Sequence, residues 1–271
     1  MRYTGIQPQY FPRLHYFARI LNTDIFVIRD DVQFVSKHKY PDGRTDKSFQ
    51  AHTPIKQSFG VQLLTVLTKH EGFTNLKQTQ LSYDHDWVEN HLKTIQVSYS
   101  KAANFPTLYP EITKLLTRRY DNLAQLNTAT IFWGLLHFLG EPPVKLEQLT
   151  LKFIKSKLAE QKTFRLKNVL YASESKSLTD RKNLTANEKI IALCKEVGAN
   201  EDYCGATGAA AYMDEELYAK NGMKITIQDW KCKEYPQLFT KKVGFIPNLS
   251  IIDLLMNTTA ERARDIILSD D

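Results

Sequence analysis

The first 34 residues constrain the fold more than any other part of the chain. A short apolar run at residues 3–6 leads into a loop bounded by two prolines, an amphipathic segment follows at 14–21, and a second apolar run covers 25–28. Short apolar runs around a helical pattern predict strand, loop, helix and strand, the opening of an α/β domain. Ligands of such domains bind outside the carboxyl ends of parallel strands, so we expect a small-molecule site at that edge.

The rest of the chain continues this pattern. We predict further strands at 61–67, 169–171, 202–204 and 224–228, and helices at 87–99, 110–120, 123–139, 147–160, 184–197, 209–221 and 249–256. Residues 35–57 show little apolar periodicity and are predicted to form a loop. The expected fold is α/β, with a parallel-rich central sheet flanked by helices, in one domain spanning residues 1–271.

Composition excludes several classes of protein. No apolar run approaches the 18 residues of a membrane helix, and charged residues interrupt the N-terminal apolar pattern, so we expect neither membrane insertion nor a secretory signal. The three cysteines are odd in number and widely spaced, which favours the reducing cytoplasm over a disulfide framework or a cysteine-based zinc site. A net charge of +6 suits an anionic substrate and leaves nucleic acid open as a less favoured partner.

Polar residues follow both of the first two predicted strands. Gln7, Gln9 and Tyr10 lie in the proline-bounded loop, where amides and an aromatic ring suit a binding pocket, although the aromatic residues could equally plug the edge of the sheet. Asp30 and Asp31 end the second strand and could bind an amine or Mg²⁺. Strand alternation points them to opposite faces, so at most one of the two should share a site.

Further candidates are spread along the chain. The best candidates for a general base are His91 and His15, because imidazole titrates near neutrality, although a helix histidine often only satisfies a backbone carbonyl. Gly205 and Gly208, with Thr207 between them, lie in a strand-to-helix turn of the kind that binds anions. The remaining substrate-binding candidates are Lys37 and His38 in a basic loop, Tyr212, Tyr235 and Gln237.

Four blocks of the chain carry a resemblance to a known family. They are QPQYFP with DIFVIRDDVQF, the step from Trp87 to His91, YCGATGAAAYMDEELYAKNG, and EYPQLF followed by GFIPNLSIIDLLMN. In this order they resemble the WbqC-like protein family. Compared with that family, residues 144–184 look like an insertion with a lysine-rich helix.

The resemblance implies a function. WbqC-like proteins are associated with gene clusters for O-antigen and other surface polysaccharides, and have been proposed to transfer glycine to a sugar amine. We therefore expect an amino-acid or acyl transferase that acts on an amine of a sugar or nucleotide-linked acceptor. His91 or His15 would be the base, with Asp31 as a further catalytic candidate; the glycine turn would hold an anion and the Asp30/Asp31 end an ammonium group.

Two other functions stay open at this point. The chain could add an amino acid to a nucleotide or nucleic-acid base, or it could bind a small ligand without catalysis. No motif for zinc, iron or haem is present, so the sequence assigns no metal and no certain cofactor; ATP with Mg²⁺ is the cofactor that it leaves open. The oligomeric state cannot be predicted.

Overall fold

A five-stranded sheet forms the centre of the structure, a computed structural model that describes residues 1–39, 43, 45–69, 72–180, 183–206 and 213–268. Every neighbouring pair of its strands is parallel. Across the sheet the order is β11 (Lys224–Ile227), β10 (Glu201–Cys204), β1 (Arg2–Ile6), β2 (Ile25–Ile28) and β9 (Asn168–Tyr171). The predicted α/β fold with a parallel-rich sheet is confirmed.

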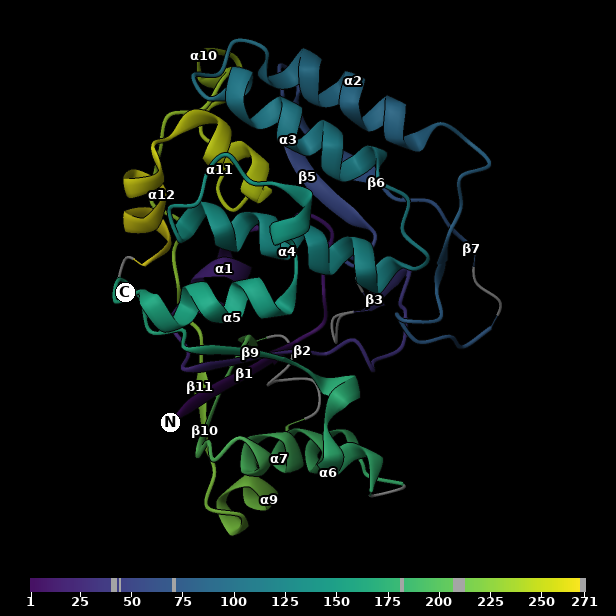
Figure 1. The fold of residues 1–271 in the computed structure, drawn as a ribbon, viewed down its shortest axis with the longest axis vertical. Coiled ribbons are helices and arrows are strands. Elements are labelled where there is room, and N and C mark those ends of the chain that lie inside the picture. Colours follow the sequence, from purple (N-terminus) through teal and green to yellow (C-terminus); the bar gives the residue numbers. More distant parts are fainter. Residues whose placement is uncertain (40–42, 44, 70–71, 181–182, 207–212, 269–271) are drawn as a thin grey trace.

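The strand order reverses at the centre of the sheet. From β1 the chain runs outward to β2 and then β9, whereas the later strands β10 and β11 lie on the other side of β1. The connection after β1 leads to a helix on one face of the sheet, and α9 (Glu215–Lys220), the first complete helix that the structure describes after β10, lies on the opposite face (Figure 1). In doubly wound sheets the ligand binds at such a point of reversal. The topology therefore directs attention to the carboxyl ends of β1 and β10.

Helices cover both faces of the sheet (Figure 1). On one side lie α1 (Leu14–Leu21), α4 (Leu123–Phe138) and α5 (Leu151–Glu160). On the other side lie α6 (Lys176–Thr179), α7 (Ala186–Glu196) and α9 (Glu215–Lys220). Strand alternation divides the core accordingly: Phe26 and Ile28 belong to a large apolar cluster on the first side, and Ile25 and Val27 to a smaller one on the second.

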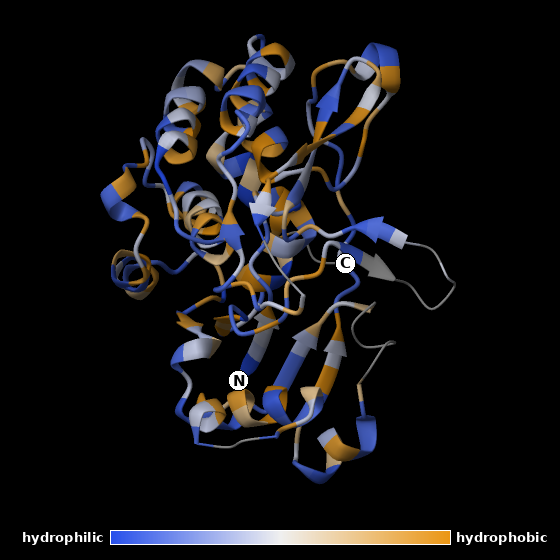
Figure 2. Cartoon of the chain, turned by 90° about the vertical axis from the view of Figure 1, so that its right-hand side faces the viewer, coloured by the Kyte–Doolittle hydropathy of each residue, from blue (hydrophilic) through white to orange (hydrophobic). Residues whose placement is uncertain are grey.

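The helix α4 forms the centre of the larger cluster. Fifteen of its sixteen residues are buried, the exception being Gln125. A helix that is buried all round must be enclosed by other elements rather than lie on the surface. In the side view of Figure 2 the helices around it carry both hydrophobic and hydrophilic segments.

Most of the remaining elements lie above the central sheet in Figure 1. Three antiparallel hairpins pair β3 (Lys37–Lys39) with β4 (Thr45–Lys47), β5 (His52–Gln57) with β6 (Gly60–Thr65), and β7 (Thr68–Lys69) with β8 (Gln80–Leu81). The other α-helices of the described residues are α2 (Trp87–Tyr99), α3 (Phe105–Thr117), α10 (Thr240–Val243), α11 (Ile251–Asn257) and α12 (Ala260–Ile267), with 3₁₀ turns at Leu146–Gln148 and Ala172–Glu174.

The structure corrects two of the sequence-based boundaries. Residues 35–57 are not a loop throughout, because they contain β3, β4 and the fully buried β5. The helix predicted at 110–120 begins at Phe105, and Pro110 lies inside it. The segment 144–184 supplies both α5 and β9, so part of it belongs to the central sheet; that it is an insertion stays a prediction.

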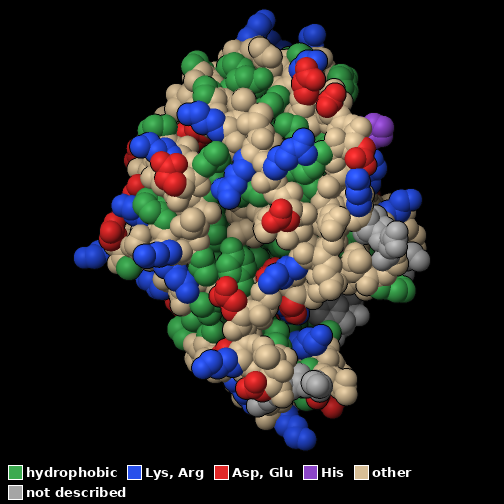
Figure 3. Space-filling model, turned by 45° about the vertical axis from the view of Figure 1, so that its right-hand side comes forward, with side chains coloured by type: hydrophobic (Ala, Val, Ile, Leu, Met, Phe, Trp, Pro, Cys, Tyr) green, Lys and Arg blue, Asp and Glu red, His purple; other side chains and the backbone are tan. Residues whose placement is uncertain are grey.

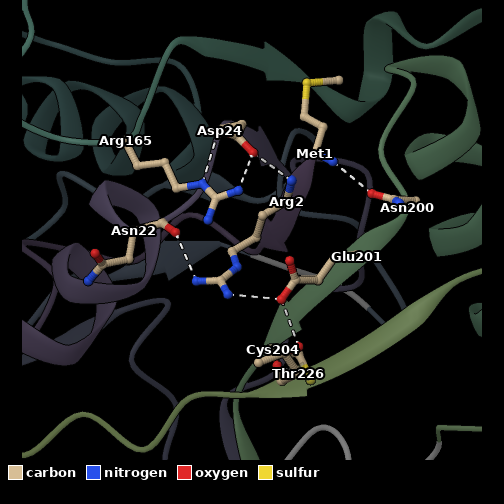
Figure 4. Close-up of polar contacts among 9 residues, drawn as sticks. All are labelled: Met1, Arg2, Asn22, Asp24, Arg165, Asn200, Glu201, Cys204 and Thr226. Atoms are coloured by element: carbon tan, nitrogen blue, oxygen red, sulfur yellow. Dashed lines mark hydrogen bonds and ion pairs between the residues drawn. The ribbon is translucent and has the colours of Figure 1, made fainter. Parts of the chain in front are cut away.

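A polar network holds the amino ends of the central strands together (Figure 4). The carboxylate of Asp24 accepts a 2.6 Å hydrogen bond from the backbone N–H of Arg2 and two from the Arg165 guanidinium, at 2.9 and 2.8 Å. The Arg2 side chain continues the network to Glu201 at 2.9 Å. These contacts tie β1, the segment before β2, the segment before β9, and β10. Burial alone would raise the pKa of Asp24, but the hydrogen bonds from Arg165 and Arg2 hold it below the ordinary value of 3.8.

We expect Asp24→Asn to lower the free energy of unfolding by roughly 1–3 kcal/mol at neutral pH, because it removes charge-assisted hydrogen bonds. The native pKa of Asp24 lies below its unfolded value, so this contribution is present above about pH 4 and is lost as the pH falls through the native pKa. Urea denaturation of both proteins between pH 7 and about pH 3 measures the difference. Asp229→Asn is the control, because Asp229 forms only an exposed ion pair with Lys231. If Asp24→Asn lowered the free energy of unfolding equally at all pH values, this would contradict the lowered pKa of Asp24 in the native protein.

Candidate functional site

The loop after β1 is buried, and other elements satisfy its backbone. Asn127 of α4 donates a 3.0 Å hydrogen bond from Nδ2 to the carbonyl of Pro8. Thr130, one turn further along the same helix, donates to the carbonyl of Gln9 at 3.3 Å and accepts from the N–H of Phe11 at 3.0 Å. Buried backbone groups need such partners. The loop is therefore fixed against α4 before any ligand binds.

Phe11 is the most constrained residue of this loop. Its φ of 37° is positive, a conformation that is costly for an aromatic residue and persists only when the surroundings enforce it. Its carbonyl accepts hydrogen bonds from the hydroxyls of Thr53 in β5, at 2.7 Å, and Ser250 before α11, at 3.0 Å. Elements far apart in sequence thus converge on one residue, and this convergence fixes the direction in which the loop leaves the sheet.

Two of the predicted site residues, Tyr10 and His91, support the loop from the interior. The Tyr10 ring is fully buried, and its hydroxyl lies 3.0 Å from Nδ1 of His91. The His91 ring also bonds to the backbone of Thr65, so both of its nitrogens have partners. Burial, with a smaller effect of His52, lowers the pKa of His91 to about 4. His91 is therefore neutral and positions Tyr10, and it lacks the free nitrogen that a general base needs.

His15 lies at the start of α1, beside the strand ends. Its Nδ1 lies 3.0 Å from the Asn248 side-chain oxygen, which also accepts from the backbone N–H of His15 at 3.0 Å. An amide oxygen only accepts, so Nδ1 carries the proton and Nε2 keeps its lone pair. Burial, followed by the charges of Arg13 and Arg19, lowers the pKa of His15 to about 3. His15 is therefore a neutral hydrogen-bond acceptor in a positively charged setting.

Arg19 brings that positive charge to the end of β10. Its Nε donates a 2.9 Å hydrogen bond to Gln228, which follows β11, and Gln228 Nε2 donates to the carbonyl of His15 at 2.9 Å. A Cβ on Gly205 would lie 2.5 Å from Arg19 Nη2, so the guanidinium fills the space over this glycine. Burial lowers the pKa of Arg19, and no carboxylate of the described residues forms an ion pair with it. The buried carboxylate of Asp202 acts on this charge without forming an ion pair with it. Partly buried positive charge that no described carboxylate contacts, beside the first residue of the predicted glycine turn, is suited to an anion.

Asp30 and Asp31 point to different surroundings, as strand alternation predicts. Asp31 is held by Arg29 through two bonds of 2.7 and 3.0 Å. Asp30 is only 4% exposed and accepts from Ser173 after β9, at 2.9 Å from the backbone N–H and 2.6 Å from the hydroxyl. It lines a pocket of about 160 Å³ between the ends of β2 and β9 and the start of α4. A second pocket, of about 320 Å³, lies between α2 and α3 and contains none of the predicted site residues.

The other predicted residues do not lie together. Gln7 stays at the strand end, where its side-chain oxygen accepts from Gln50 at 2.9 Å, and Gln9 is buried in the loop. Lys37 is exposed in β3, and His38 belongs to the same strand. Thr207, Gly208 and Tyr212 lie outside the described residues.

Tyr235 and Gln237 belong to a buried cluster around Lys56 and Asp253. Gln237 accepts from the Lys56 ammonium group at 2.8 Å, and the Tyr235 hydroxyl donates to Asp253 at 2.8 Å. Burial raises the pKa of Asp253 to about 6. Both residues thereby stabilise the interior between β5 and α11, and the structure does not bring them into the group formed by His15 and Arg19.

Residues that sequence reasoning missed complete the edge. They are Arg19, Gln228 and Asn248 near β10, and Lys77 and Ser173 near Asp30. Only Arg19 carried a signal, as a charged residue inside an otherwise apolar helix. Among the residues that the structure describes, no group of three or more His, Cys, Asp or Glu side chains could hold a metal ion, and no helix is long and apolar enough to cross a membrane.

The neutral state of His91 predicts a pH dependence of stability. Its pKa of about 4 in the native protein lies below the ordinary 6.5, so unfolding takes up a proton between these values and stability falls as the pH drops through this window. The expected contribution is about 3 kcal/mol across the window. His91→Gln, which can still accept from Tyr10 and donate to Thr65, should flatten the dependence, as followed by urea denaturation. An unchanged slope in this variant would contradict the buried neutral state.

Comparisons with known proteins identify the family. A model of the WbqC-like protein family matches residues 7–265. The chain is also 27% identical over 259 residues to "Uncharacterized protein Rv1507c" of Mycobacterium tuberculosis, in an alignment that covers 94% of this chain and 93% of that protein. No solved structure matches the chain. Because the family model spans nearly the whole sequence, including the loop after β1 and the end of α11, the chain belongs to the WbqC-like protein family.

Proposed function

We propose that the chain is a transferase that binds a phosphate-bearing substrate at the carboxyl ends of β1 and β10 and joins an amino acid or related acyl group to an amine. The observation that supports the binding step is Arg19, a partly buried guanidinium that forms no ion pair with a carboxylate of the described residues. Arg13 and Gly205 lie in the same neighbourhood. An anionic ligand would supply the missing negative charge.

In the proposed reaction the acceptor nitrogen attacks the carbonyl carbon of an activated acyl donor. The C–N bond forms, the bond to the leaving group breaks with its electron pair, and the nitrogen loses a proton to a base. Of the two histidines predicted as bases, His15 keeps an acceptor nitrogen, Nε2, because its Nδ1 donates to Asn248. Burial is the main cause of the low pKa of His15, and the charges of Arg13 and Arg19 lower it further; a bound anion would offset those charges and raise this pKa.

The family supports the choice of reaction and acceptor. WbqC-like proteins are associated with surface-polysaccharide clusters, so the proposed acceptor is an amine on a sugar or a nucleotide-linked sugar of O-antigen type. The proposed activation uses ATP with Mg²⁺. We place the protein in the cytoplasm, where nucleotide-linked sugars are made.

Modification of a nucleic acid is the alternative, and the surface charge disfavours it. On the face shown in Figure 3, the described Lys and Arg side chains are distributed among Asp and Glu side chains instead of gathering in one stripe. Proteins that track a phosphate backbone usually present a continuous basic surface.

Calorimetric titration with UDP, ADP and inorganic pyrophosphate, each with and without Mg²⁺, tests the anion site. We expect Arg19→Gln to weaken binding roughly tenfold or more, because a charge-assisted bond is lost. Gly205→Ala should also weaken it while leaving the melting temperature nearly unchanged, because its new Cβ displaces only the end of the Arg19 side chain. Arg262→Gln, at an exposed position of α12, is the matched control.

Turnover is tested separately. Protein incubated with ATP, Mg²⁺, an amino-acid mixture and UDP-glucosamine should yield an acceptor heavier by one aminoacyl residue in mass spectrometry. Binding without any product would support a non-catalytic ligand-binding protein. Binding of oligonucleotides alone, with a steep dependence on salt, would support nucleic-acid modification instead.

A further inference from the structure

The hairpin of β5 and β6 has a free edge. In Figure 1 it lies above the central sheet, and Gln57 at the end of β5 donates a 2.6 Å hydrogen bond to Ser98 of α2. The strand β5 is buried along its whole length, whereas β6 pairs only with β5 among the described strands. The outer side of β6 therefore presents unpaired backbone groups, which can pair with a strand of another molecule.

Pro54 of β5 shows which residues of β6 point to this edge. Pro54 lies opposite Leu63 and has no N–H, so the two residues cannot exchange the paired backbone bonds of a bonded position. The Pro54 carbonyl instead accepts from the N–H of Ser250 at 2.9 Å, so it is directed away from β6. Bonded and non-bonded positions alternate along an antiparallel pair, so the backbone groups of Leu63 and Val61 point outward. Among the described residues, nothing outside the hairpin bonds to them.

The side chains along this edge are apolar. Phe59, Val61 and Leu63 are 71%, 48% and 37% exposed, and they make up three of the eight large hydrophobic side chains that are exposed among the described residues. Edge strands usually carry charged residues or proline that keep other strands away, but residues 57–68 contain neither. An apolar edge without these protections is typical of an interface between proteins.

The charge of the protein favours a second copy as the partner. A net charge of +6 makes copies repel one another, and this repulsion is weakest where both surfaces are uncharged, as residues 57–68 are. A peptide strand of another protein would need pockets that select its alternate side chains, and no residue of β6 lines either pocket described above. A two-fold interface needs only a surface that is complementary to itself.

We propose that the protein forms a dimer in which β6 pairs with β6 of a second copy, antiparallel, about a two-fold axis at Gln62. In this register Val61 lies opposite Leu63 of the second copy and exchanges two backbone hydrogen bonds with it, and the symmetry repeats the pair. The two hairpins become one four-stranded sheet. The valine and leucine side chains form an apolar cluster on one face, and the two Gln62 amides, each a donor and an acceptor, meet on the other.

Sedimentation velocity at physiological salt, from low to high micromolar protein concentration, tests the dimer. We expect a dimer whose fraction rises with concentration. Leu63→Lys removes two packed leucines from the interface and adds like charges, so it should weaken dimerisation roughly tenfold or more. Ile227→Lys, at a more exposed residue of β11 on the edge of the central sheet, is the control and should leave the dimer unchanged. Circular dichroism checks that both variants are folded.

Cysteine cross-linking tests the register without weakening the interface. Opposite residues at a non-bonded position have Cα atoms about 4.5 Å apart, within the range of a disulfide. Gln62→Cys should therefore form a covalent dimer when it is oxidised with copper phenanthroline. Val61→Cys should not, because the two copies of this residue are displaced by two positions along the strands, too far for a disulfide. The wild type, with its buried and half-buried cysteines, is the control.

The possible results are distinguishable. A wild type that stays monomeric at every concentration would overturn the dimer and leave the edge to a strand of another protein. A dimer that Leu63→Lys does not weaken would place the interface elsewhere and overturn the proposal. Cross-linking of Val61→Cys but not of Gln62→Cys would overturn the two-fold axis at Gln62. A dimer that is lost in Leu63→Lys, kept in Ile227→Lys and cross-linked in Gln62→Cys would establish it.

Discussion

The burial of the loop after β1 is the constraint on which the rest of the edge depends. A buried loop cannot give its polar backbone groups to water, so side chains must replace water. Asn127 and Thr130 of α4, Thr53 of β5 and Ser250 before α11 do so. These side chains come from three distant parts of the chain, which means that the loop takes its conformation only when the whole domain has assembled. The positive φ of Phe11 is the local cost of this arrangement.

With the loop fixed, the carboxyl edge of the sheet carries positive charge at one end and negative charge at the other. Partly buried positive charge of Arg19 gathers near β10, and the buried carboxylate of Asp30 lies near β9. The two histidines predicted as bases are both neutral, but for different reasons. His91 is enclosed and supports Tyr10, whereas His15 is held neutral in part by the arginines beside it. Of these two histidines, only His15 has neighbouring charges that a bound anion would offset.

Local patterns predicted the first half of the sheet well. The boundaries of α1, β2 and α2 agree with the residues at which apolar periodicity starts and stops. The strand β5 escaped detection because Pro54 and Lys56, which look unsuited to a buried strand, are accommodated there, with Lys56 donating to Gln237 and to the Gly244 carbonyl. No short-range pattern can reveal a partner 181 residues away.

The sequence predicted only part of the candidate site. Again, the residues that it missed depend on contacts between distant parts of the chain. Strand ends can be recognised locally, which is why Gln7 and Asp30 were found. Which helix side chain reaches which strand end depends on the strand order, so the approach of Arg19 to Gly205 and of Ser173 to Asp30 could not be predicted. The burial of other predicted residues has the same origin. Tyr10 and Tyr235 look like binding residues because they are aromatic and polar, yet the fold buries both as partners of internal groups.

Hydrogen–deuterium exchange with and without UDP-glucosamine tests the central claim most directly, because it maps ligand contact along the whole described chain without a mutation. The account predicts slower exchange in the segments at the carboxyl ends of the parallel strands, residues 5–13, 28–33, 171–176 and 203–206. It also predicts unchanged exchange around the pocket between α2 and α3, at residues 83–92 and 116–119. Protection confined to that second pocket would contradict the account and move the site away from the sheet.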